Sequence, residues 1–135
     1  MNALSGQLTT AWEKSIGQLD CGTDGVWTGT GWTGMPIIIQ WDSETRALLG
    51  IAEEFKAKDG FTEVISPAMD GKIYFFELNT GKATRSPIDM GVVNKGTAAL
   101  DPRGYPLLYL GQGVQSTSAE GTYGAWFRVV SLIDN

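Results

Sequence analysis

The side chains of this sequence that could carry out catalysis are mainly carboxylates, because the chain contains no histidine. Glu53 and Glu54 are adjacent, Asp42 and Glu44 are close, and paired carboxyl groups can act as acid and base on a glycosidic bond. Neighbouring residues of a strand point to opposite faces, so Glu53 and Glu54 are poorly placed to share a site. Without histidine the commonest general base and the Ser-His and Cys-His pairs are missing. We therefore predict no catalytic residue and favour a non-enzymatic protein, with an enzyme as the open alternative.

Two further motifs suggest a bound metal or nucleotide but fit those ligands poorly. Asp20 and Asp24 flank a glycine turn, and no third carboxylate stands at the spacing of a calcium loop, so we expect no metal site. Residues 29–34 fit the G-x-G-x-x-G pattern of dinucleotide sites, which requires a helix after the glycines. The residues that follow, 36–41, are typical of a strand. We interpret these glycines as close packing between sheets, and we expect no cofactor.

Aromatic residues are the best candidates for ligand binding, although most aromatic residues of small β domains lie in the core. The aromatic side chains that could offer a stacking surface are Trp27, Trp32, Trp41, Trp126, Tyr105 and Tyr123. Tyr123 and Trp126 differ from the others because they border residues 111–124, a stretch rich in glycine and serine that is typical of an enlarged loop. Functional residues concentrate on such loops. We predict that Tyr123 and Trp126 bind a ligand, either a glycan or a protein.

Length, composition and charge limit the remaining classes of protein. The 135 residues correspond to one ordinary domain, and the 42% of hydrophobic residues with 18 glycines are typical of a folded chain rich in turns. The net charge of −5 and the scattered basic residues argue against a nucleic-acid partner. The longest apolar runs are much shorter than the roughly 20 residues that span a bilayer. We expect no membrane span and see no signal peptide, and the single Cys21 cannot form an internal disulfide.

Short β-strands are predicted along most of the chain. Residues 36–41, 72–77 and 125–130 are rich in β-branched and aromatic side chains and are bounded by turn-forming residues. The Asp-Gly pair at residues 70–71 predicts a two-residue hairpin turn, because this pair tolerates the positive φ angles of a type I′ turn. A second turn is predicted at residues 101–104.

A short polar phrase recurs along the chain: a polar residue, two spacers, a hydroxyl residue and a turn former. Its copies begin at Asn2, Asp42 and Glu77, with a degenerate copy at Ser131. The intervals between them are 40, 35 and 54 residues, and periods near 40 belong to propeller blades or helical arrays. The strand-forming residues favour blades. We therefore expect the three strands predicted above to occupy matching places in neighbouring sheets.

Residues 44–58 are the segment for which the two kinds of signal disagree. They are rich in good helix formers, with Leu48, Ile51 and Phe55 at helical spacing. In the repeat, however, this segment follows the phrase at Asp42, where an outer strand is expected. We expect a strand, with a helix as the alternative.

Residues 70–82 resemble the repeat of quinoprotein-like β-propellers, which begins with an aspartate-glycine pair, continues through an apolar residue and tyrosine, and ends in threonine-glycine-lysine. The resemblance implies an all-β fold, namely a partial β-propeller of antiparallel blades. Residues 1–135 would form a single unit of about three propeller repeats, a fragment of a larger propeller. The tryptophan that docks neighbouring blades in that family is replaced here by Arg85, and Trp12 stands two positions late in the first copy.

The same resemblance leaves two functions open. We favour a non-enzymatic binding or scaffold module that works outside the cell or in the cell envelope. Its partners would be the remaining blades of a parent propeller, copies of itself joined through open blade edges, or a protein or glycan ligand. The alternative is a part of a quinone-dependent dehydrogenase whose catalytic residues lie outside this chain. Several such enzymes use a pair of adjacent cysteines, which Cys21 alone cannot supply.

Overall fold

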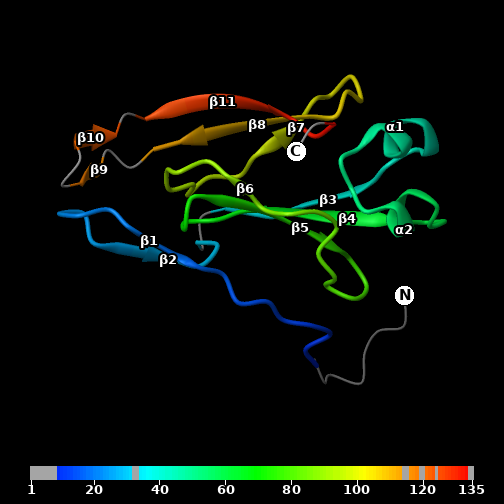
Figure 1. Ribbon diagram of the computed structural model, residues 1–135, viewed down its shortest axis with the longest axis horizontal. Helices are drawn as coiled ribbons and strands as arrows, with labels where there is room; N and C mark the ends of the chain where they lie inside the picture. The colour runs from blue at the N-terminus through cyan, green and yellow to red at the C-terminus, as the bar shows by residue number, and fades with distance from the viewer. Residues whose placement is uncertain (1–8, 32–33, 114–115, 119–120, 124, 134–135) are drawn as a thin grey trace.

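The computed structural model describes residues 9–31, 34–113, 116–118, 121–123 and 125–133 (Figure 1). These residues are mostly antiparallel β-sheet with two short helices, in agreement with the all-β expectation. Four consecutive strands form the larger sheet in chain order, β3 (Ile37–Gln40), β4 (Thr62–Pro67), β5 (Lys72–Glu77) and β6 (Ile88–Asp89). This sheet is a meander, since each strand pairs with the next strand in the sequence.

The second sheet contains three strands in the order β11-β8-β7, namely β7 (Ala99–Leu100), β8 (Leu107–Gln112) and β11 (Trp126–Ser131). It is also a meander, except that the hairpin of β9 (Ser116–Ser118) and β10 (Gly121–Tyr123) stands between β8 and β11. The stretch predicted as an enlarged loop therefore contains a small hairpin of its own. A further hairpin near the N-terminus pairs β1 (Gln18–Asp20) with β2 (Val26–Thr28).

The hydrophobic core lies between the two sheets. Alternate residues of a strand share a face, and Ile65, Ile73 and Phe75 of the larger sheet pack in one cluster with Leu108 and Leu110 of β8. Figure 1 shows β8 and β11 running along one side of the larger sheet, while the N-terminal segment runs along its other side. The molecule is thus layered, with two sheets stacked face to face.

The predicted equivalence of the three strands is wrong for the first of them. Residues 36–41 supply β3, which lies in the same sheet as β5 with β4 between them, and not in a neighbouring sheet. Residues 72–77 and 125–130 do supply corresponding strands of different sheets, because β5 and β11 each follow the second strand of their meander. The polar phrase therefore marks the end of a strand, and it occurs twice within one sheet.

The polar phrases at Asp42 and Glu77 form the same local structure. The carboxylate of Asp42 accepts hydrogen bonds from the Thr45 N–H at 2.8 Å and the Thr45 hydroxyl at 2.7 Å. The carboxylate of Glu77 accepts the equivalent bonds from Thr80 at 2.9 and 2.7 Å. In both copies the backbone N–H of the fifth residue, Arg46 or Gly81, donates to the first carbonyl at 2.9 Å. The repeat seen in the sequence is therefore a repeat of one helical turn.

The residue after this turn decides how the chain continues. Gly81 has a φ of +66°, which ends the turn and returns the chain toward a bridge between Phe76 and Ala83. Arg46 stands at the same place after Asp42, and there the turn continues into helix α1 (Ser43–Leu48). Helix α2 (Glu53–Lys56) follows after a short connection.

The expectation of a strand at residues 44–58 is therefore wrong, and the helix propensity of this segment prevails. The two helices lie at one end of the sheets (Figure 1), where Phe55 of α2 and Leu49 and Ile51 of the connection between the helices are buried in the core. Two backbone hydrogen bonds fix the connection between them, from Gly50 N–H to the Leu132 carbonyl at 3.1 Å and from Ala52 N–H to the Thr84 carbonyl at 2.9 Å. The segment closes the end of the core.

Turns lie at both predicted places, but the first one is longer than the two residues predicted, because four residues separate β4 from β5. Residues 68–71 connect β4 to β5, and Gly71 has the positive φ, +83°, that the Asp-Gly pair predicted. Residues 101–104 lie between β7 and β8 and are closed by a hydrogen bond of 3.1 Å from Gly104 N–H to the Asp101 carbonyl. In both turns an aspartate side chain accepts a hydrogen bond from the backbone N–H two residues later.

Candidate functional site

The outward face of the β7-β8-β11 sheet is the most distinctive surface of the described residues. Because Leu108, Leu110 and Val130 point into the core, the alternating residues of β8 and β11 point away from it. The outward residues with apolar or aromatic side chains are Leu107, Tyr109, Phe127 and Val129, and Gly111 and Ser131 share this face with them. Phe127 is 73% exposed and Val129 is 51% exposed. An antiparallel sheet with one solvated face usually carries polar residues there, so this sheet is apolar on both faces.

The outward residues form a continuous patch. Val129 is the cross-strand partner of Tyr109, and the rings of Tyr109 and Phe127 lie 6.5 Å apart between centroids. Cross-strand aromatic and β-branched pairs of this kind stabilise a sheet, but they normally do so under cover. Contiguous exposed apolar surface marks an interaction site or an aggregation hazard. We call Leu107, Tyr109, Phe127 and Val129 the outer patch.

Asp101 and Arg103 fix the turn beside the outer patch. The Asp101 carboxylate accepts hydrogen bonds from Arg103 Nη2 at 2.7 Å, Arg103 Nε at 3.0 Å and the Tyr109 hydroxyl at 2.7 Å. The bonds from Arg103 and then from Tyr109 hold the pKa of Asp101 well below its usual range. The bond to Asp101 raises the pKa of Tyr109. These hydrogen bonds hold the Tyr109 side chain of the outer patch in place beside the turn.

The structure places the two predicted ligand-binding residues on different elements. Trp126 begins β11, where its ring is 52% exposed and the guanidinium carbon of Arg128 lies 5.5 Å from the ring centroid. Tyr123 ends β10, with Ser116 as its backbone partner, and its side chain lies outside the described part of the molecule. Trp126 shares the inward side of the strand with Arg128 and Val130, so it is not part of the outer patch. A joint site of Tyr123 and Trp126 stays a prediction.

Arg85, which replaces the family's docking tryptophan, lies buried where the two sheets meet. Its Nη1 donates a hydrogen bond of 2.7 Å to the Leu132 carbonyl at the end of β11, and its Nη2 lies 3.4 Å from both carboxylate oxygens of Glu63. The guanidinium carbon lies 4.6 Å from the centroid of the Phe75 ring. Burial lowers the pKa of Arg85, while the charge of Glu63 opposes this change. Arg85 thus joins β4, β5 and the end of β11 in one polar contact.

Both carboxylate oxygens of Glu63 take part in this contact between the sheets. Its oxygens also accept hydrogen bonds from the Trp41 indole N–H at 2.9 Å and the Thr84 hydroxyl at 2.6 Å. A buried charge is stable only when it is paired and hydrogen-bonded. Glu63 meets that condition, and Arg85 meets it through Nη1 and Nη2, although its Nε is buried without a hydrogen-bond partner. We therefore assign this pair to the structure and not to catalysis, and Trp41, a possible stacking residue in the sequence, is a core residue.

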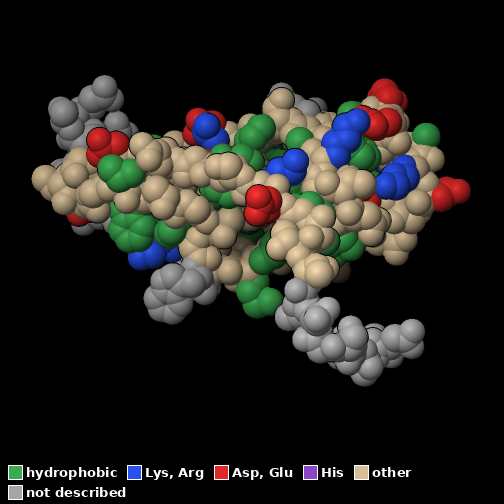
Figure 2. All heavy atoms as spheres, turned by 90° about the horizontal axis from the view of Figure 1, so that it is seen from below, with side chains coloured by type: hydrophobic (Ala, Val, Ile, Leu, Met, Phe, Trp, Pro, Cys, Tyr) green, Lys and Arg blue, Asp and Glu red, His purple; other side chains and the backbone are tan. Residues whose placement is uncertain are grey.

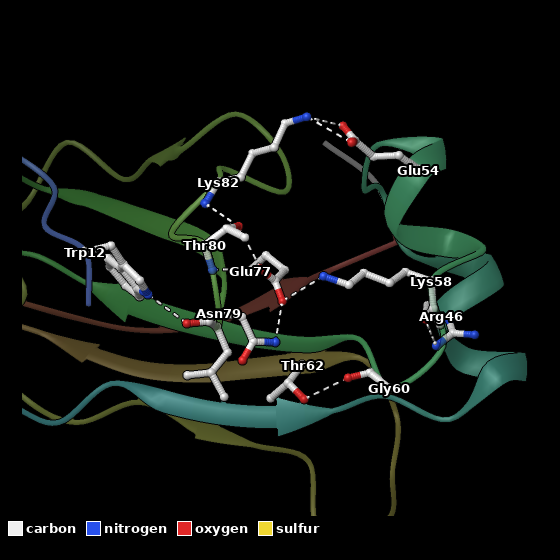
Figure 3. Close-up of polar contacts among 11 residues, drawn as sticks. Trp12, Arg46, Glu54, Lys58, Gly60, Thr62, Glu77, Asn79, Thr80 and Lys82 are labelled. Carbon is white, nitrogen blue, oxygen red and sulfur yellow. Dashed lines mark hydrogen bonds and ion pairs between the residues drawn. The ribbon is translucent and has the colours of Figure 1, made fainter.

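The adjacent carboxylates of Glu53 and Glu54 form separate ion pairs. Glu53 pairs with Lys56 at 2.9 Å, whereas Glu54 pairs with Lys82 at 2.7 Å (Figure 3). They lie on helix α2, so the strand geometry used to separate them does not apply. The interpretation of the pair as a solvated surface agrees with their exposure.

Neither of the two other ligand motifs has the surroundings that its ligand would need. Residues 29–34 are followed by strand β3, so no helix N-terminus stands after the glycines. Within the described ranges, no three metal-ligating side chains gather in one place, Asp20 and Asp24 included. None of the helices described is long and apolar enough to cross a bilayer.

A cleft on the opposite side of the larger sheet was not predicted from the sequence. Trp12 packs against Phe76, with 5.7 Å between ring centroids, and its indole N–H donates a hydrogen bond of 2.7 Å to the Leu78 carbonyl. Only glycine fits beneath this ring at position 81, because a Cβ there would lie 2.6 Å from it. The N-terminal segment held in this way forms one wall of a cleft of about 220 Å³. The sequence offered Trp12 as a displaced docking residue but gave no sign of a cavity.

No protein-family model, curated protein or solved structure matches this chain.

Proposed function

We propose that the chain is a non-enzymatic binding or scaffold module whose two meanders are propeller-type blades, and that its outer patch accepts a further β-sheet. The similarity of residues 70–82 to the quinoprotein-like repeat supports the blade assignment. This stretch spans the turn before β5, the strand itself and the helical turn of the polar phrase at Glu77. We also propose the localisation that the resemblance implies, outside the cell or in the cell envelope.

The apolar character of the outer patch is the observation that carries this proposal. The inner face of the β7-β8-β11 sheet packs on a neighbouring sheet, and the outer face offers the same kind of residues for a second neighbour. Covering a side chain such as Phe127 or Val129 contributes about 1.5–3 kcal/mol when the whole side chain leaves water. The partners are the remaining blades of a parent propeller or, for the isolated chain, a second copy of itself.

Sedimentation velocity over a wide range of protein concentration tests this proposal. We expect the wild-type chain to associate as its concentration rises, and we expect Phe127→Glu to shift association to higher concentration, because a charge would have to be buried. Leu48→Glu is the matched control, since Leu48 is an exposed apolar residue of helix α1 outside the patch. A wild-type chain that stays monomeric at every concentration would contradict the proposal, as would equal association of Phe127→Glu and the wild type.

A further inference from the structure

The cleft beneath the N-terminal segment has an apolar floor and a polar rim. Its floor consists of Val64, Pro67 and Phe76 of strands β4 and β5, all of which are buried. Trp12 and Ile16 form the wall on the side of the N-terminal segment. Figure 2 views the molecule from below, where hydrophobic side chains reach the surface at several places between scattered charged ones. The cleft is therefore lined mainly by apolar residues.

Three polar side chains line the cleft. Lys14 and Thr30 are exposed, whereas Ser66 is buried on β4. Among the described residues that line the cleft, Lys14 is the only charged one. Among the described residues, the Lys14 ammonium group takes part in none of the ion pairs. A cation at the mouth of an apolar cleft favours a ligand that is apolar at one end and anionic at the other.

We propose that this cleft binds a small planar aromatic carboxylate. The ring would lie against Val64, Phe76 and Trp12, and the carboxylate would accept a charge-assisted hydrogen bond from Lys14. The size of the cleft agrees with this ligand class, since an apolar cavity of about 150 Å³ holds a benzene ring and this one measures about 220 Å³. The chain carries a net charge of −5, which repels anions. The Lys14 ammonium group at the mouth of the cleft would offset this repulsion locally. This site is independent of the outer patch and of the function proposed for it.

Benzoate is the probe, with uncharged benzamide as its matched control. In an NMR titration of the full chain, we expect benzoate to shift the backbone amide signals of Val64, Ser66 and Phe76. Lys14→Gln should weaken benzoate binding about tenfold, because it removes a charge-assisted bond, and should leave benzamide binding unchanged. Lys56→Gln removes an ammonium group of helix α2 that does not line the cleft, and it should change neither.

The outcomes separate the parts of the proposal. Lys14 is exposed, so its substitution is expected to leave the fold intact, and an unchanged amide spectrum outside the cleft checks this. Absence of benzoate binding, or binding with shifts confined to other parts of the chain, would overturn the site. Equal binding of benzoate and benzamide, or equal benzoate binding by the wild type and Lys14→Gln, would overturn the choice of an anion. The association measured for the outer patch does not depend on any of these results.

Discussion

Glu77 offers the most direct test of how the polar phrase stabilises the fold. Its carboxylate is buried and yet ionised. Its Oε2 accepts hydrogen bonds from the Thr80 N–H and hydroxyl, and its Oε1 accepts one from the Asn79 amide at 3.0 Å and lies 3.0 Å from Lys58 Nζ (Figure 3). Burial by itself raises the pKa of this carboxyl group. The bonds from Thr80 and Lys58 outweigh burial and lower the pKa to about 2 from an ordinary value of 4.5.

This pKa determines how stability depends on pH. The difference between 4.5 and about 2, at 1.36 kcal/mol for each pH unit, corresponds to about 3 kcal/mol. The Lys58 side chain is 39% exposed, and solvent screening reduces the figure to about 2 kcal/mol. The folded-state pKa lies below the unfolded-state pKa, so this stability is fully present above pH 4.5 and is lost as the pH falls through about 2.

Urea unfolding of the wild type and Glu77→Gln at several pH values measures this contribution. At pH 7 we expect the variant to be less stable by about 2 kcal/mol, because an uncharged amide cannot reproduce the bond to Lys58. The two proteins should converge as the pH approaches 2, whatever the other carboxylates contribute. Glu53→Gln is the control, since Glu53 is 86% exposed and its substitution should matter little. A stability difference between wild type and Glu77→Gln that is the same at every pH would refute this reasoning.

Three other predictions concern the joint between the sheets and the ligand. Arg85→Ala should destabilise the chain by about 3 kcal/mol in urea unfolding, because it leaves Glu63 buried without its partner. Arg85→Ala combined with Glu63→Leu should recover part of this loss. An Arg85→Ala variant as stable as the wild type would contradict the role of Arg85 in joining the two sheets. Tyr123→Ala and Trp126→Ala should weaken glycan or peptide binding by a protein that contains this chain, and unchanged binding on arrays would remove that prediction. Added quinone cofactor and calcium should leave the melting temperature unchanged, since a ligand that binds only the folded state would raise it, and a rise would favour the dehydrogenase alternative.

Local features of the sequence predicted local structure well. The Asp-Gly pair at residues 70–71 predicted a turn, and the β-branched and aromatic runs predicted strands, because both signals act over a few residues. The polar phrase was also a true repeat of local structure, as the matching hydrogen bonds at Asp42 and Glu77 show. Its place in the fold was not predictable, because it ends two strands of the same sheet.

The errors arose where one residue changes the path of the chain. Gly81 ends the turn after Glu77, and Arg46 at the equivalent place lets a helix continue, so the repeat register suggested a strand where helix propensity was correct. The buried pair of Glu63 and Arg85 was also missed, since the two residues are 22 positions apart and meet only through packing. The cleft was missed for the same reason, as its walls come from segments distant in sequence.

Intermolecular contacts measured in a mixture of isotopically labelled and unlabelled chains test the central claim most directly. At high protein concentration we expect filtered NMR spectra to show contacts from the Phe127 ring and the Val129 methyl groups to the second copy. Contacts that arise only from the helices α1 and α2, or a complete absence of contacts between copies, would contradict the claim that the outer patch accepts a further sheet.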